Sequence, residues 1–321
     1  NSGVIASVDG ISVGGLVFDF FVFPGLIFTL AVGILASWIV RKVSALIQWR
    51  VGPPLLQPVY DITKLFGKEN IIPAKSTEWG YLIVPLLGPA GFLLASIILV
   101  KANYLVTAFI GDVIVVLYLL ILPALSVVLG GMSSGNPISS FGSNRELRLI
   151  IAYELPLLLA VTTAIVRTGG DLKLAAFTSQ AVAASISGTL AFIAALLCIQ
   201  AELGFIPFDT PEAETELMGG PLIEYSGPLL GLFKISHLMA LLVLPLFLVT
   251  VFLGGFSTGW GALWGGLKYV LILVGIILIK NTNPRLRSDQ ALKFFWYGAA
   301  PLALLSLILA VVGDLIGVGW V

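Results

Sequence analysis

Long apolar runs alternate with short polar segments along nearly the whole chain. A run of about 20 apolar residues is long enough to cross the hydrocarbon core of a bilayer as a helix. We expect about eight such spans, at residues 20–40, 80–100, 110–131, 147–166, 186–203, 226–252, 263–281 and 298–318. The pattern predicts an all-α, polytopic membrane protein that forms one integral membrane domain over residues 1–321.

One segment in the first long polar loop follows a different pattern. Apolar residues recur at helical spacing from Leu55 to Phe66, prolines are confined to the start, and Gly67 follows. This pattern is typical of a short amphipathic helix. Such a helix either rests in the headgroup layer or forms a lid or docking platform beside a cavity, and the spacing agrees with both.

The composition narrows the function classes. Hydrophobic residues make up 58% of the chain and charged residues only 11%, with a net charge of zero, which argues against a nucleic-acid partner. The single cysteine and single histidine cannot form a disulfide, a zinc site or an iron–sulfur cluster within the chain. We therefore expect no metal site here, and we expect any redox cofactor to be on another chain.

Basic residues are distributed unevenly among the polar loops. One set of loops contains Arg41, Lys42, Arg50, Lys64, Lys68, Lys75, Arg145, Arg148, Lys280, Arg285, Arg287 and Lys293. The opposite loops contain Lys101, Arg167 and Lys173. Because basic loops remain in the cytoplasm, we expect a multi-pass protein of the cell membrane with both termini outside and the long loops cytoplasmic.

Acidic residues are concentrated on the same basic side. The residues in question are Glu202, Asp209, Glu212, Glu214, Glu216 and Glu224. Pro207 and Pro211 prevent the preceding helix from simply continuing, and Glu212 and Glu216 are spaced to share a helix face. The segment is either a solvated loop or, as its interleaved Phe, Pro, Leu and Met residues favour, a partly packed loop that stores and releases a proton.

Ionisable residues also occur inside two predicted spans. Glu154 lies about two turns inside the fourth span, just before Pro156, and an ionisable residue there indicates a functional site, with a structural role as the alternative. Arg148 is six residues from Glu154, so each is expected to meet a group on another element. Lys234 and His237 share a face of the sixth span, which indicates either a polar track or a snorkelling lysine beside a satisfied histidine.

Residues 283–290 contain Arg285 and Arg287 and have two interpretations. They could be an ordinary basic anchor of the membrane topology, or they could supply counter-charges to the acidic segment, because both are expected on the cytoplasmic side.

Four segments together resemble the membrane subunit of respiratory complex I that docks the peripheral redox arm (subunit 1), and its counterparts in membrane-bound nickel–iron hydrogenases. They occur in family order across most of the chain. The segments are Gly-Pro…Gln-Pro-x-x-Asp-x-x-Lys at 52–64, Arg148 with Tyr153-Glu154, Pro-Phe-Asp-x-x-Glu-Ala-Glu-x-Glu-Leu at 207–217 followed by Glu224-Tyr225-Ser226, and Pro-Arg-x-Arg-x-Asp-Gln at 284–290.

The resemblance implies an eight-helix subunit between a cytoplasmic electron-transfer arm and ion-translocating membrane subunits. It also assigns expected roles to several residues. Asp209, Glu212, Glu214 and Glu216 resemble a loop that couples redox events to proton movement, and Glu154 and Glu224 resemble carboxylates of the path into the membrane. We add Glu202, Lys234 and His237 to that path from their positions. Arg148, Arg285 and Arg287 look like its basic partners, and Gln57, Asp61 and Lys64 belong to the docking loop.

The sequence departs from the quinone-reducing branch of this family just before the acidic segment. Those members usually have Glu-Thr-Asn/Gly-Arg-x-Pro-Phe-Asp, whereas Leu203 and Phe205 replace the hydroxyl residue and the arginine here. On the sixth span, Leu229 and His237 differ from the basic residue and the glutamate of complex I members. The Glu-Ala-Glu-Thr-Glu form is more similar to the hydrogenase branch.

The expected function is therefore that of a non-catalytic membrane subunit in a ferredoxin-dependent, hydrogen-evolving complex, which couples redox chemistry to proton or sodium translocation. Nickel–iron and iron–sulfur centres are expected on peripheral partner subunits, with antiporter-like subunits as membrane partners and ferredoxin as electron donor. The alternatives are the quinone-binding subunit of a complex I-type oxidoreductase, the same subunit of a sulfur-reducing relative, and a stand-alone secondary transporter. The missing internal repeat argues against the last.

Overall fold

The computed structural model describes residues 13–104, 109–178, 180–211, 218–256 and 259–317, and within these ranges the chain contains helices and no β-strand. The predicted all-α class is confirmed. The long helices are α2 (Leu26–Ile47), α4 (Glu78–Tyr104), α5 (Asp112–Ser133), α6 (Pro137–Arg167), α8 (Ile186–Glu202), α10 (Gly227–Phe252), α11 (Trp260–Thr282) and α13 (Ala300–Ile316). The short ones are α1 (Val13–Phe21), α3 (Gln57–Phe66), α7 (Leu174–Phe177) and α12 (Ser288–Phe294), with 3₁₀ turns η1 (Val182–Ala184) and η2 (Gly220–Leu222) and a π-helical segment η3 (Phe295–Ala299).

Seven helices of the described chain are long and apolar enough to cross a membrane. An eighth is counted if residues 174–184 and α8, which meet at an angle of 105°, form one bent span. The polytopic architecture predicted from the sequence is thus confirmed. The predicted amphipathic helix is present as α3, which ends at Phe66, directly before Gly67.

The structure corrects three predicted boundaries. The first candidate span runs over Val17–Ile47, beyond the predicted end at residue 40, and Pro24 and Gly25 interrupt it between α1 and α2. The fourth begins at Pro137, where the side chain of Asn136 accepts a hydrogen bond of 2.9 Å from the backbone N–H of Ile138. Glu154 therefore lies near the middle of α6 rather than two turns inside it. The last span continues from α12 through η3 into α13, so Asp289 and Gln290 are helical.

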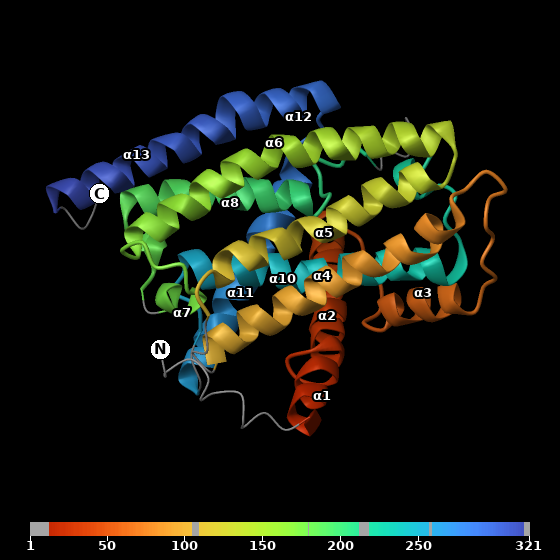
Figure 1. Ribbon diagram of the computed structural model, residues 1–321, viewed down its shortest axis with the longest axis horizontal. Coiled ribbons are helices and arrows are strands. Elements are labelled where there is room, and N and C mark those ends of the chain that lie inside the picture. Colours follow the sequence, from red (N-terminus) through yellow and green to blue (C-terminus); the bar gives the residue numbers. More distant parts are fainter. Residues whose placement is uncertain (1–12, 105–108, 179, 212–217, 257–258, 318–321) are drawn as a thin grey trace, which may run out of the picture.

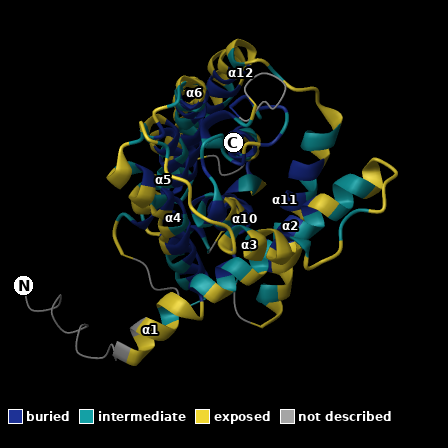
Figure 2. Ribbon diagram, turned by 90° about the vertical axis from the view of Figure 1, so that its right-hand side faces the viewer, coloured by how far each residue is buried: buried dark blue, intermediate teal, exposed yellow. Residues whose placement is uncertain are grey.

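Helix α10 is the most deeply buried of the spanning helices (Figures 1 and 2). In its most apolar 18-residue stretch 89% of the residues are buried, compared with 28% for α11. It packs against α2, α3, α4, α8 and α11, whereas α6 packs between α5, α8 and α13. Apolar side chains surround α10 on most sides, so the polar groups that it carries must meet each other or line an internal space.

Polar loops gather at one end of the spanning helices, because consecutive spans alternate in direction. This end carries the described loop residues 48–56, 67–77, 134–136, 203–211, 218–226 and 283–287. We call it the loop side. It holds most of the acidic and basic residues singled out from the sequence, which is the physical basis for a site there.

A close approach of two backbones positions α10 beside α2. A methyl group at Gly33 would lie 2.4 Å from the carbonyl oxygen of Leu238, a distance that a Cβ atom essentially never tolerates. The absence of a side chain at Gly33 therefore allows the two helices to pack with their backbones in contact.

The variant Gly33→Ala is expected to destabilise the fold by about 1–3 kcal/mol, because the added methyl group must push α2 away from α10. The matched control is Gly275→Ala in α11, where a Cβ atom meets nothing within 4 Å and the change to alanine favours the helix. Thermal unfolding of the purified complex checks both variants. Equal melting temperatures for Gly33→Ala and wild type would contradict the close approach.

Candidate functional site

The segment 203–211, which follows α8 on the loop side, is packed rather than solvated. Gly204 takes a left-handed conformation, with φ of +63°, and turns the chain after α8. The side chains of Leu203 and Phe208 are 2% and 1% exposed, and the Phe208 ring lies 4.7 Å from the ring of Phe295 in η3. Of the two interpretations of the acidic loop, the partly packed one therefore holds for its described part.

Two contacts connect segment 203–211 to the loop before α12. Arg285 forms an ion pair with Asp209, and the backbone N–H of Leu286 donates a 2.9 Å hydrogen bond to the carbonyl of Pro207. Residues 283–287 therefore do supply a counter-charge to the acidic segment, as one interpretation of the sequence expected. Arg287 forms no ion pair with a described carboxylate; its backbone N–H instead donates to the side chain of Gln290 at the start of α12.

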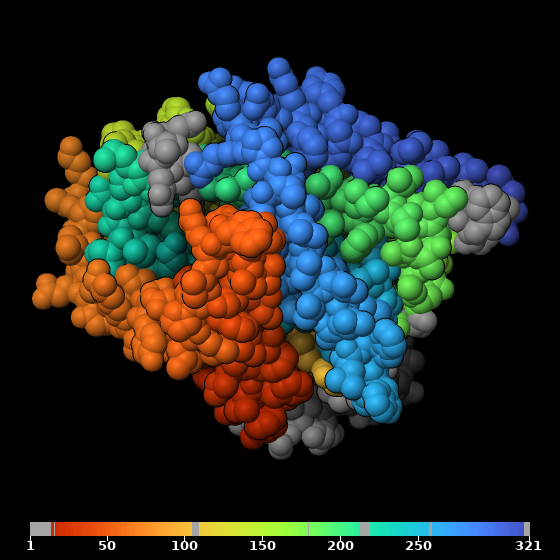
Figure 3. Space-filling view, turned by 180° about the vertical axis from the view of Figure 1, so that it is seen from behind, coloured from red at the N-terminus to blue at the C-terminus, as the bar shows by residue number. Residues whose placement is uncertain are grey.

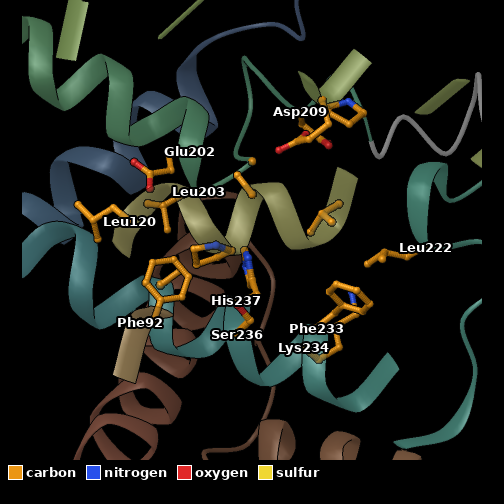
Figure 4. Close-up of a pocket in the computed structure, with 17 residues that line it drawn as sticks. Phe92, Leu120, Glu202, Leu203, Asp209, Leu222, Phe233, Lys234, Ser236 and His237 are labelled. Carbon is orange, nitrogen blue, oxygen red and sulfur yellow. The ribbon is translucent and has the colours of Figure 1, made fainter. Parts of the chain in front are cut away.

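A cavity of about 140 Å³ lies beneath this segment, and we call it the acidic cavity. Its polar walls are Glu146, Glu202, Asp209, Lys234, Ser236 and His237, and apolar side chains of α4, α5 and α10 complete it. Figure 4 shows Glu202 and His237 on opposite walls.

The carboxylate of Glu202 has an unusual environment. Both of its oxygens are buried and lack a hydrogen-bond partner within the described part of the chain, and the same holds for Oε2 of Glu154. Glu146 and Glu154 lie close enough to Glu202 to interact with it electrostatically. A buried carboxylate without a partner is costly when charged, so any change of charge has a large energetic effect here.

A second cavity of about 520 Å³ adjoins the first, and we call it the basic cavity. The two cavities share Lys234 and His237, whose exposed side chains line both. The basic cavity is also lined by Arg41, Asp61, Lys64, Lys68, Phe205 and Lys280. Arg41 and Lys280 also line a third, more open space of about 610 Å³ on the loop side. The three spaces form a series from the loop side to the acidic cavity.

Helix α3 is a wall of the basic cavity. Pro58, Asp61, Ile62, Lys64 and Leu65 face it. Asp61 accepts hydrogen bonds from Arg41 of α2 at 3.2 Å and from Gln57 at 3.0 Å, so α3 is attached to α2 by an ion pair. The structure thus places the expected docking-loop residues Gln57, Asp61 and Lys64 beside a cavity, which favours the lid or platform interpretation of this helix.

Phe205 separates Lys280 from His237 at the wall of the basic cavity. The Lys280 ammonium lies 4.1 Å from the centre of the Phe205 ring, a cation–π distance. The same ring meets His237 edge-on at 5.7 Å. The residue that departs from the quinone-reducing pattern thus presents an aromatic face to a lysine in place of a hydrogen-bond donor.

Glu224 occupies a separate polar cluster and lines neither of these cavities. Its carboxylate accepts a 2.5 Å hydrogen bond from Asn136, and its carbonyl accepts one of 2.8 Å from the Tyr81 hydroxyl. The Tyr81 and Tyr225 rings are stacked with centres 4.2 Å apart, and burial raises the pKa of the Tyr225 phenol. The structure therefore does not join Glu224 to Glu154 and Glu202.

The remaining expected residues divide into two groups. Arg148 is exposed and forms no ion pair with a described carboxylate, so it is not a partner of Glu154 in this structure. Glu212, Glu214 and Glu216 lie outside the described residues. No group of three or more His, Cys, Asp or Glu side chains in the described ranges is arranged to hold a metal ion.

Sequence reasoning missed four residues that shape the site: Arg41, Asn136, Glu146 and Lys280. From the sequence, Arg41 and Lys280 were used only to predict which loops are cytoplasmic. Nothing in the local sequence shows that the ends of α2 and α11 line the same cavity. The local sequence indicates only a helix cap at Asn136. Its hydrogen bond to Glu224 joins residues that are 88 positions apart, so the local pattern does not indicate it. Glu146 carried a weak signal, because it lies two turns before Glu154 on one helix.

Comparison with known proteins agrees with this architecture. The NADH dehydrogenase family matches residues 21–311. The chain belongs to the NADH dehydrogenase subunit 1 family, whose members are membrane subunits of complex I. The resemblance seen in the four sequence segments is thereby confirmed, and this protein is a membrane subunit of complex I type.

Curated relatives from this family cover most of the length of the chain. The chain is 33% identical over 313 residues to the H subunit of the NADH-quinone oxidoreductase of Thermomicrobium roseum, and the match covers 88% of this chain and 92% of that relative. The corresponding protein of Syntrophotalea carbinolica is 34% identical over 291 residues, with coverage of 84% and 87%.

A solved structure is also similar to this protein. It belongs to the membrane-bound sulfane sulfur reductase, an archaeal respiratory membrane complex, and it matches with a TM-score of 0.80 and 30% identity over 88% of this chain and 96% of that chain.

The variant Arg285→Gln is expected to loosen segment 203–211, because it removes the ion pair with Asp209. A partly exposed pair contributes up to about 1 kcal/mol, so backbone amide exchange in this segment should accelerate by up to about fivefold. Hydrogen–deuterium exchange of the purified complex measures this change. Arg287→Gln is the matched control and should leave the exchange unchanged; equal acceleration in both variants would show that the ion pair is not the cause.

Proposed function

We propose that this subunit couples electron transfer to ion translocation in a ferredoxin-dependent, hydrogen-evolving membrane complex, without carrying out the redox chemistry itself. Reduced ferredoxin would supply electrons to cluster-bearing peripheral subunits, and protons would accept them at a nickel–iron site to form hydrogen. This subunit would contribute the loop side as the docking surface, facing the cytoplasm as the distribution of Lys and Arg favours. Antiporter-like subunits would receive the coupling signal in the membrane.

The observation that supports a non-quinone reaction is the placement of Phe205. Its ring packs against Lys280 and His237, where quinone-reducing members of the family usually have an arginine. A site that recognises a quinone carbonyl needs a positioned donor, and an aromatic ring at this place supplies none.

Two alternatives have specific support. The similarity to a chain of the membrane-bound sulfane sulfur reductase complex favours a sulfur compound as terminal acceptor. The names of the curated relatives favour a quinone. All three functions share the same architecture, so the reaction has to be identified from the partners and the substrates.

Isolation of the intact complex through a tag on this subunit distinguishes these reactions. We expect mass spectrometry to detect a nickel–iron subunit, and we expect reduced ferredoxin to drive hydrogen evolution. Polysulfide reduction without hydrogen evolution would support the sulfur-reducing alternative. A bound quinone together with quinone-dependent turnover would overturn the interpretation of Phe205.

The coupling role is supported by the buried, partnerless carboxylate of Glu202 beside Glu146 and Glu154. A proton that arrives or leaves here would change the charge of a cavity that also contains Lys234 and His237. Conformational or charge changes at the docking surface would reach this cavity through segment 203–211, which begins directly after Glu202.

The variant Glu202→Gln removes the titratable proton and keeps the side-chain shape. It should reduce the number of ions translocated per electron by at least about tenfold. The complex should still assemble, because Glu202 accepts no hydrogen bond from the described part of the chain that the change would remove. Ion uptake into proteoliposomes, measured together with electron transfer, gives this ratio. Glu214→Gln and Glu216→Gln should act in the same direction.

Glu78→Gln is the matched control for these variants. It neutralises an exposed carboxylate at the start of α4, on the loop side but outside both cavities, and should leave the ratio unchanged. A wild-type ratio in Glu202→Gln would contradict the proposed role of the acidic cavity.

A further inference from the structure

The basic cavity has a charge composition that a neutral ligand would not satisfy. Among the described residues, five basic side chains line it, namely Arg41, Lys64, Lys68, Lys234 and Lys280, against one carboxylate, that of Asp61. Asp61 is already engaged by Arg41 and Gln57. Within the described part of the chain, none of the four lysines forms an ion pair.

Apolar side chains complete the walls of the same cavity. Val40 of α2, Ile62 and Leu65 of α3, and Leu230, Leu238 and Leu241 of α10 face it. A ligand that matches both parts has an anionic group and a hydrocarbon chain. The volume of about 520 Å³ is within the range of roughly 300–1,000 Å³ that is usual for small-molecule sites.

The position of the cavity agrees with a ligand that comes from the membrane. Arg41 and Lys280 lie six and two residues before the ends of α2 and α11, so they lie within roughly 9 Å of the helix ends on the loop side. Figure 3 shows α2, α3 and α11 on one face of the molecule. Helix α3 is amphipathic, and such helices typically rest at the depth where lipid headgroups and hydrocarbon chains meet.

We propose that the basic cavity binds a membrane phospholipid with an anionic headgroup, whose phosphate is held by Lys64, Lys68 and Lys280 and whose hydrocarbon chain lies along Leu65, Leu230 and Leu241. Phosphate is the anion that matches several converging ammonium groups, because each oxygen can accept a separate charge-assisted hydrogen bond. The inference does not depend on which electron acceptor the complex uses.

This site would also influence the acidic cavity. Lys234 lines both spaces. A phosphate in the basic cavity would therefore attract the Lys234 ammonium group and weaken its electrostatic interaction with Glu202 and Asp209 in the acidic cavity. An anionic lipid would then be a structural component of the polar connection between the loop side and the membrane interior. With a neutral lipid in the same place, the counter-charges near Lys234 among the described residues would be those of the acidic cavity and Asp61.

Photo-crosslinking of the whole complex in nanodiscs tests the proposal. The probes are phosphatidylglycerol and phosphatidylcholine with the same diazirine-bearing acyl chain, and the labelled peptides are identified by mass spectrometry. We expect phosphatidylglycerol to label α3 and the first half of α10 several-fold more than phosphatidylcholine. Inorganic phosphate should compete weakly, because it lacks the hydrocarbon chain.

Single lysine variants test the contacts. Lys68→Gln and Lys280→Gln should each reduce labelling by phosphatidylglycerol about fivefold, the factor that corresponds to about 1 kcal/mol per basic residue. Lys293→Gln removes an exposed lysine of α12 on the same side that does not line the cavity, and should leave labelling unchanged. Gel filtration of each variant complex verifies assembly, and lipid extraction from the wild-type complex should recover anionic phospholipid.

Three outcomes would overturn the proposal. Equal labelling by the two lipids would show that the charge of the headgroup is not recognised. Complete displacement by inorganic phosphate would reduce the site to a simple anion site. Labelling that rises when Glu212, Glu214 and Glu216 are replaced by Gln would mean that the acids of this chain, and not a lipid, supply the counter-charge.

Discussion

Helix α10 is buried along most of its length, yet it carries Lys234 and His237 near the loop side. The helices around them are packed with apolar side chains, and polar or charged groups are costly in such surroundings unless they meet water or counter-charges. The architecture resolves this conflict by leaving spaces on both sides of them. The acidic cavity is on one side and the basic cavity on the other, and the loops of the loop side are arranged around the two.

Segment 203–211 depends on the same arrangement. A solvated loop would leave the acidic cavity open, whereas Leu203 and Phe208 anchor this one in the apolar interior and direct Asp209 toward Arg285. The ion pair itself is partly exposed and contributes little to stability. Its main effect is to fix the position of segment 203–211 relative to residues 283–287, and so to determine which part of the segment lies above Glu202. Phe205 has a related role at the other cavity, where its ring meets both Lys280 and His237.

The sequence was sufficient to predict the elements and insufficient to predict the cavities. Apolar runs and the period of α3 follow from local patterns, so the helix class and the amphipathic helix could be predicted correctly. Hydropathy alone did not predict the break in the first span at Pro24. It also did not predict the helix start after Asn136, which caps a helix that begins in a polar stretch. The site residues were found because charges are conspicuous in an apolar chain. The sequence did not predict how these residues are grouped. Glu224 lies apart from Glu202, and Arg41 and Lys280 line the same space, because of the way in which distant helices pack.

The shared wall of Lys234 and His237 has a thermodynamic consequence. Two spaces of opposite charge that are separated by the same side chains form a linked system, and a coupling free energy between two binding events acts equally in both directions. If a proton bound beside Glu202 alters the affinity of an anion in the basic cavity, that anion alters the affinity for the proton by the same factor. The lipid composition of the surrounding membrane would then influence the proton affinity of the acidic cavity. The protonation state of that cavity would in turn influence which lipid the basic cavity binds.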